Sequence, residues 1–178
     1  VITLPAPILR KQAKPVKSID KKVFKIIEDL KDTLASQKHP TGVGISAPQI
    51  GQSWQICLVK TKETEKPTVL LNPKITWQSK KNTGVNSGGH QFEGCLSVPG
   101  LWGPVKRPQE VKVQYLTAEG KTKTEKFTDF ASVVTQHEID HLNGILFIDR
   151  ILQQNGKLYK IVKDGKEKEI FEEVKITP

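Results

Sequence analysis

Residues 136–144, QHEIDHLNG, contain two histidines four positions apart, with a glutamate beside the first. Residues four apart on a helix lie on one face, about 40° from each other. His137 and His141 could therefore bind the same metal ion, with Glu138 next to them in the chain. The alternative is that both histidines are ordinary helix residues with a chance spacing. HExxH on a helix favours a metal centre, with the glutamate as general base.

The residues on either side of this motif predict where its helix begins and ends. Thr128 and Asp129 are both suitable N-caps. Asn143 and Gly144 are typical of a helix end and follow Leu142 directly. The sequence therefore predicts a helix from residue 128 or 129 to residue 142.

The remaining elements are predicted from hydrophobic periodicity and turn residues. A helix is expected over 18–36, capped by Ser18, because apolar residues recur there at helical spacing: Ile19, Val23, Ile27, Leu30 and Leu34. Strands are expected at 54–60 and 67–77, with hairpins at 110–128 and, at the C-terminal end, 157–176. One α+β domain spanning residues 1–178 accommodates all of them.

A catalytic metal usually has three protein ligands and keeps one position open for water. No histidine follows His141, and the last glutamates alternate with lysines as solvated charges do. Cys95 is better placed, because its glycine-flanked turn EGCLSVPG (93–100) could direct a thiolate toward the helix. Cys57 lies in the apolar segment WQICLVK (54–60) and is predicted to fill the core instead.

Composition limits the classes of protein to consider. The chain has 178 residues, 36% hydrophobic and 26% charged, and contains no apolar run long enough to cross a membrane. Two cysteines and the absence of a signal-peptide pattern favour a reducing, cytoplasmic setting. The net charge is +9, but the lysines are dispersed among acidic residues, so no specific nucleic-acid recognition is expected.

Three segments together resemble the signature motifs of peptide deformylases, in the same order: GVGISAPQIG (42–51), EGCLSVPG (93–100) and QHEIDHLNG (136–144). The resemblance covers roughly residues 1–152. It implies the deformylase fold, with mixed antiparallel strands around a central helix that carries HExxH. It also implies a metal-dependent hydrolase that removes the formyl group from the N-terminal formylmethionine of new polypeptides and releases formate.

The resemblance assigns roles to individual positions. It implies Cys95, His137 and His141 as metal ligands, Glu138 as general acid and base, and Gln49 with the backbone N–H of Leu96 as oxyanion donors. Arg107 matches a family arginine that could pair with Glu93. The substrate-binding residues expected from proximity to the motifs are Gly44, Ile45, Glu93, Gly94 and Ile139, together with residues near Leu101 and Trp102.

The metal and the partners follow from the same resemblance. One thiolate and two imidazoles suit Fe(II) or Zn(II), and the family favours Fe(II) physiologically, with zinc, nickel or cobalt as substitutes. The expected partners are N-formylmethionyl nascent peptides and, transiently, the ribosome. A hairpin is predicted at 157–176, where many bacterial relatives have a long helix that can contribute to ribosome docking. The expected compartment is the cytoplasm, with a phage or organellar origin also compatible.

Two other classes of function share some of these features. A metallopeptidase that cuts internal peptide bonds would use the same HExxH motif but would have to accept chain on both sides of the bond. A basic, ribosome-associated protein with a structural metal would have a closed fourth ligand position and no turnover. Glu138 and Gln49 argue against the structural metal.

Overall fold

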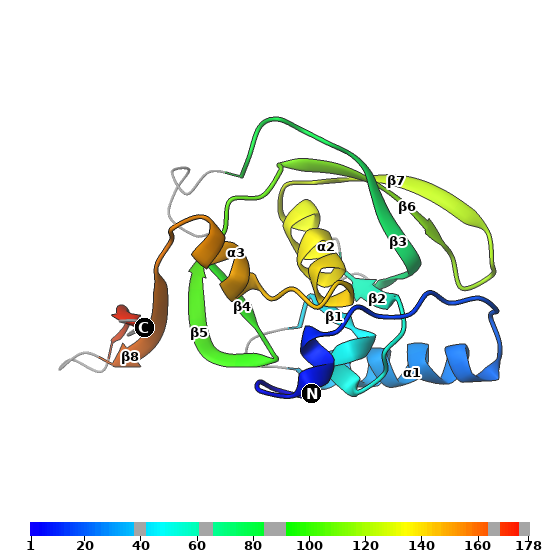
Figure 1. Cartoon of the computed structure of the whole chain (residues 1–178), viewed down its shortest axis with the longest axis horizontal. Coiled ribbons are helices and arrows are strands. Elements are labelled where there is room, and N and C mark those ends of the chain that lie inside the picture. Colours follow the sequence, from blue (N-terminus) through cyan, green and yellow to red (C-terminus); the bar gives the residue numbers. More distant parts are fainter. Residues whose placement is uncertain (38–41, 61–65, 84–91, 164–167, 175–178) are drawn as a thin grey trace.

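The chain forms a helix near its N-terminus, then a series of strands, two consecutive helices and a final pair of strands (Figure 1). The structure is a computed structural model that describes residues 1–37, 42–60, 66–83, 92–163 and 168–174. Its helices are α1 (Lys21–Ser36), α2 (Asp129–Leu142) and α3 (Phe147–Gln153), with 3-10 turns η1 (Pro7–Arg10) and η2 (Ala47–Ile50). Its strands are β1 (Gly44–Ser46), β2 (Ile56–Val59), β3 (Thr68–Gln78), β4 (Phe92–Cys95), β5 (Val98–Pro104), β6 (Glu110–Leu116), β7 (Thr122–Thr128), β8 (Leu158–Lys163) and β9 (Glu169–Val174).

The strands form two antiparallel sheets. One sheet has the order β1-β2-β3-β6-β7, and the other has the order β4-β5-β8-β9. Helix α2, yellow in Figure 1, lies at the centre of the fold and contacts β1, β2, β6 and β7 of the first sheet. The expected α+β class, with antiparallel strands around a central HExxH helix, is confirmed.

Helix α2 has the bounds that its sequence predicts. It begins at Asp129, directly after β7, and its last residue is Leu142. The backbone N–H of Asn143 closes the final turn on the carbonyls of Asp140 and His141. Gly144 has a φ of +72°, and a Cβ there would lie 2.7 Å from the backbone of Arg10. Glycine is therefore required both for the left-handed turn and for the close approach of the N-terminal segment.

Helix α1 differs from its prediction at the N-terminus. It begins at Lys21, and the cap is Asp20, whose Oδ1 accepts a hydrogen bond of 3.0 Å from the backbone N–H of Val23. Ser18 is therefore not the cap, because the carboxylate two residues later already satisfies the first turn. The expected apolar face is confirmed: it packs with β1 and β2 in a core cluster that includes Ile27, Leu30 and Leu34.

The predicted C-terminal hairpin is confirmed, although its connecting turn at 164–167 lies outside the described residues. β8 and β9 pair from Leu158↔Val174 to Lys163↔Glu169. β8 also pairs with β5, so the hairpin extends the four-stranded sheet. The sequence did not predict α3, β1 or the β4–β5 hairpin, which replaces the isolated turn expected around Cys95.

Helices long and apolar enough to span a membrane do not occur within the described residues.

Candidate metal centre

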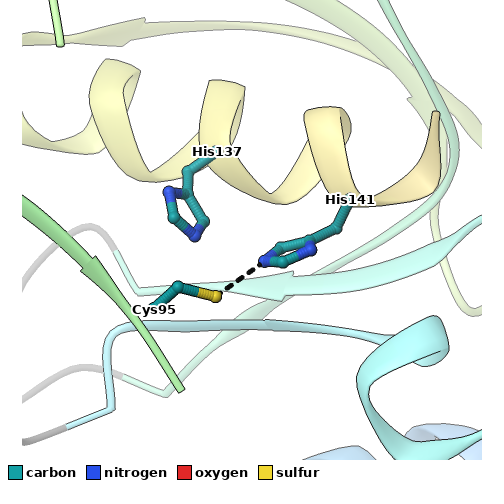
Figure 2. A group of neighbouring side chains, drawn as sticks. All are labelled: Cys95, His137 and His141. Carbon is teal, nitrogen blue, oxygen red and sulfur yellow. Dashed lines mark hydrogen bonds between the residues drawn. The ribbon is translucent and has the colours of Figure 1, made fainter. Parts of the chain in front are cut away.

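Cys95, His137 and His141 meet between the end of β4 and two successive turns of α2 (Figure 2). Their candidate ligand atoms all lie within 4.8 Å of one another, and Cys95 Sγ is 3.2 Å from His141 Nε2. Both imidazoles point from the helix toward the sulfur atom. The structure therefore brings together the three residues that the sequence predicted, although Cys95 precedes both histidines by more than 40 positions in the chain.

The chemistry of these donors fits a divalent metal. Burial, with the nearby His137 and Arg107, lowers the pKa of His141 well below its usual range, so its imidazole is neutral and can donate a lone pair. Burial lowers the pKa of His137, but hydrogen bonds with Cys95 and Glu93 outweigh burial and raise it. The surroundings of His137 thus favour a positive charge, which a bound cation would supply in place of the proton.

A buried carboxylate orients the first histidine. Glu93 Oε2 lies 2.8 Å from His137 Nδ1, which leaves Nε2 of that ring for a metal. Arg107 binds the same carboxylate in a bidentate manner, with Nη2 2.9 Å from Oε2, and also donates from Nη1 to Asp140 at 2.8 Å. Burial opposes ionisation of Glu93, but these hydrogen bonds hold its pKa at about 2. The expected Glu93–Arg107 pair is confirmed.

Glu138 is only 3% exposed and faces the backbone of β1. Its Oε2 atom has no hydrogen-bond partner in the described part of the chain, and burial raises its pKa to about 7. A Cβ at position 44 would lie 2.5 Å from Oε1, so Gly44 is the residue that leaves space for this carboxyl group. A carboxyl group poised near neutrality can both accept and return a proton.

Gln49 is held by its own loop. Its Oε1 accepts hydrogen bonds from the backbone N–H and the hydroxyl of Ser46, at 2.8 and 2.9 Å. Nε2 is consequently turned away from Ser46 and lies 3.8 Å from Cys95 Sγ. The η2 turn that carries Gln49 thereby presents an amide donor to the candidate metal centre. Sequence reasoning did not identify Ser46 as the residue that orients it.

The sequence model of the family described as "Polypeptide deformylase" matches residues 1–157. The chain belongs to the polypeptide deformylase family. Its similarity to individual members extends over most of both chains.

A peptide deformylase of Bartonella tribocorum is 36% identical, over 98% of this chain and 97% of that protein. One from Desulfotalea psychrophila is 38% identical, over 90% and 91%. The crystal structure of the Thermotoga maritima enzyme gives a TM-score of 0.74 at 35% identity, covering 84% of this chain and 95% of that one. That of Synechococcus elongatus, in complex with actinonin, gives 0.75 at 34%, covering 84% and 76%.

The metal centre of this deformylase opens into a cavity of about 650 Å³. The expected substrate-binding residues Gly44, Glu93 and Gly94 line it, as do Leu101 and Trp102. Leu96, one of the expected oxyanion donors, lines it too.

Two of the expected residues do not line this cavity. Ile45 is fully buried in the core cluster that includes the apolar face of α1. Ile139 is 7% exposed and belongs to a second core cluster, which includes other residues of α2. Ile45 follows Gly44 in a strand and so points to the opposite face. Ile139 is two positions from His137, about 200° around the helix. Neither can reach the deformylase cavity from that position.

Helix α2 contributes three apolar lining residues that the sequence analysis missed: Phe130, Val133 and Val134. They precede His137 by seven, four and three positions, and so lie on the same face of the helix as that ligand. Helical periodicity counted backward from His137 would have identified them as cavity residues of this deformylase.

Proposed function

We propose that Cys95, His137 and His141 hold the divalent metal with which this peptide deformylase removes the N-terminal formyl group of nascent polypeptides and releases formate. The observation that carries the proposal is the convergence of three ligand atoms within 4.8 Å at the cavity, beside the buried carboxyl group of Glu138. Membership of the family supports the reaction, and the arrangement of these residues supports the roles proposed for them.

The donor set limits the choice of metal. One thiolate and two imidazoles accept Fe(II) or Zn(II), and Fe(II) is the proposed physiological metal, with zinc, nickel or cobalt as substitutes. When bound, the ion supplies Lewis acidity that lowers the pKa of a coordinated water toward neutrality. The Glu93 carboxylate holds the His137 ring in the orientation that such an ion requires.

Glu138 is the proposed general acid and base. Its Oε2 atom has no partner in the described residues, so it is free to accept a proton from the attacking water. The carboxylic acid so formed can then donate that proton to the departing amine nitrogen. Water adds to the formyl carbon, the C–N bond breaks, and formate leaves with a free N-terminus on the peptide.

Gln49 and Leu96 are the proposed oxyanion donors. The Gln49 amide is fixed by Ser46 with its Nε2 facing Cys95, and Leu96 follows Cys95 at the turn of the β4–β5 hairpin. Both lie beside the place where the formyl oxygen gains negative charge. Donors that are already oriented stabilise that charge without the cost of reorganisation.

The apolar part of the cavity is the proposed site for the methionine side chain. Phe130, Val133 and Val134 line it from α2, and Leu101 and Trp102 line it from β5. The enzyme would act in the cytoplasm, where formylated chains are made, and a transient contact with the ribosome would bring it to them. Phage-encoded and organellar settings are equally compatible with this substrate.

The test is formate release from formyl-Met-Ala-Ser by the Fe(II)-loaded protein without oxygen, with metal content measured for every variant. We expect turnover by the wild type, near-complete loss with retained metal for Glu138→Ala, and loss of metal for Cys95→Ala. If the metal-loaded wild type releases no formate but cuts internal peptide bonds, the protein is a metallopeptidase and this proposal is wrong. Full activity of Cys95→Ala would exclude the proposed ligand set.

A further inference from the structure

Three aromatic rings from separate strands meet beside the cavity. Phe92 of β4 stacks on Tyr159 of β8 with ring centroids 5.0 Å apart and an interplanar angle of 18°. Phe171 of β9 meets Phe92 edge to face at 4.6 Å, and Tyr159 at 6.4 Å. Phe92 itself lines the cavity, whereas Phe171 is 45% exposed. The rings therefore connect the cavity wall with the C-terminal hairpin.

Sheet register places these rings and Trp102 on one face. Gly94 pairs with Trp102, and Trp102 pairs with Tyr159 on the next strand. A Cβ at Gly94 would lie 2.6 Å from the Trp102 ring, so that ring lies over the glycine. Alternation along β4 and β9 brings Phe92 and Phe171 to the same face.

The opposite face of the hairpin is anchored in the core. Leu158 and Val174, which pair across β8 and β9, pack in the cluster that also contacts Cys95. The hairpin thus has a face of aromatic rings directed toward the cavity wall and a face fixed beside a metal ligand. This division indicates that the hairpin holds the cavity wall in place.

We infer that the β8–β9 hairpin is part of the peptide-binding site, with Tyr159 and Phe171 as positioning residues that hold the Phe92 ring against the substrate. Phe92 is three residues from Cys95 along β4, a distance of roughly 10 Å. An extended peptide covers that distance in about three residues. All residues of β4 from Phe92 to Cys95 line the cavity. A peptide that extends along β4 with its formyl group at the metal centre therefore brings an apolar side chain two residues after formylmethionine to Phe92. This inference rests on the proposed function.

The chain offers a matched pair of variants to test it. Phe171→Ala removes a ring of the cluster, and Ile170→Ala removes a neighbour of similar exposure, 43%, that points to the opposite face. We expect Phe171→Ala to raise KM for formyl-Met-Ala-Phe by roughly 3- to 10-fold, the range for loss of an aromatic contact. We expect kcat to stay within about twofold, and KM for formyl-Met-Ala-Ser to change little. The variant Phe171→Tyr, which keeps an aromatic ring at this position, should have the wild-type KM.

Substrate affinity without turnover gives a second measurement. In a Glu138→Ala background, calorimetric titration with formyl-Met-Ala-Phe should show the same weakening for Phe171→Ala and none for Ile170→Ala. Equal effects of the two variants, or no selective loss for the phenylalanine peptide, would overturn the inference. Should Phe171→Ala not fold, Phe171→Leu replaces it with the same expectation. If the wild type releases no formate, the proposed function is wrong. The titration would still measure whether the hairpin contributes to peptide affinity.

Discussion

Glu138 shows how a single residue combines burial with reactivity. Its carboxyl group is almost fully buried, and burial raises its pKa to about 7. It is adjacent in sequence to one candidate ligand, yet it points toward the backbone of β1 at Gly44. Helix α2 therefore sets the position of Glu138, whereas β1 contributes to the environment of its carboxyl group.

Replacing Glu138 by glutamine keeps the shape of the side chain but removes its ability to take a proton. We expect Glu138→Gln to reduce kcat by about 10²- to 10⁴-fold, the usual contribution of a general base. Metal content should match the wild type, because the three ligands are unchanged. Formate release together with metal analysis measures both. Loss of metal in this variant would mean that Glu138 is part of the ligand set.

Gly44 is a second residue on which the proposed chemistry depends. An alanine there would place Cβ 2.5 Å from Glu138 Oε1 and 2.8 Å from Val134 Cγ1. We expect Gly44→Ala to displace the carboxyl group and lower kcat at least about tenfold, since proton transfer requires hydrogen-bond geometry. Circular dichroism would show whether the fold is kept. Wild-type kcat in a folded Gly44→Ala protein would contradict this placement of Glu138.

At the scale of elements, the segment between β5 and β6 joins β4 to α2 through Arg107. This guanidinium is 4% exposed and binds Glu93 on one side and Asp140 on the other. Gln136 and Ser132 of α2 also donate to the carbonyl of Pro108. The strand that carries Cys95 is thereby tied to the helix that carries both histidines.

Arg107→Met would remove the cation that two buried carboxylates share, leaving Glu93 with His137 and Asp140 with Arg150. We expect the free energy of unfolding to fall by about 3–5 kcal/mol, as for other broken buried ion pairs. Metal affinity should fall about 10- to 100-fold, because Glu93 would no longer be held against His137. Arg10→Met is the control, since the side chains of its pair with Asp149 are 40% and 28% exposed and the pair should contribute about 1 kcal/mol or less. Denaturant unfolding and metal titration test both variants, and equal losses would argue against this role.

At the scale of the whole molecule, the core divides into clusters with different relations to the site. Ile151 of α3 is fully buried in the cluster that packs against Cys95. Leu30 of α1 is equally buried in the cluster on the far side of β1 and β2. Stability can therefore be lowered in two places with different consequences for the metal.

We expect Ile151→Ala and Leu30→Ala each to cost about 2–5 kcal/mol of unfolding free energy, as for other large-to-small core changes. Only Ile151→Ala should also weaken metal binding, because the cavity it creates lies in the cluster beside a ligand. Chemical denaturation and metal retention after dialysis give the two measurements. Equal metal loss in both variants would show that the site responds to global stability alone.

Much of the fold and of the candidate site was predictable because the signals are local. The four-residue spacing of His137 and His141 places them on one helical face whatever surrounds the helix. The bounds of α2 and the strands of the β6–β7 hairpin follow from caps, alternation and turn residues close in sequence. Cys95 was found by its chemistry and its place in a motif.

Only the tertiary structure decided the features that depend on contacts between distant segments. The ion pairs of Arg107 and the aromatic cluster of Phe92, Tyr159 and Phe171 come from strand pairing and packing across the chain. Ile45 and Ile139 were misplaced because adjacency to a motif does not specify which face a side chain occupies. Helical spacing constrains neighbours a few residues apart, whereas sheet register and burial are set by the whole molecule.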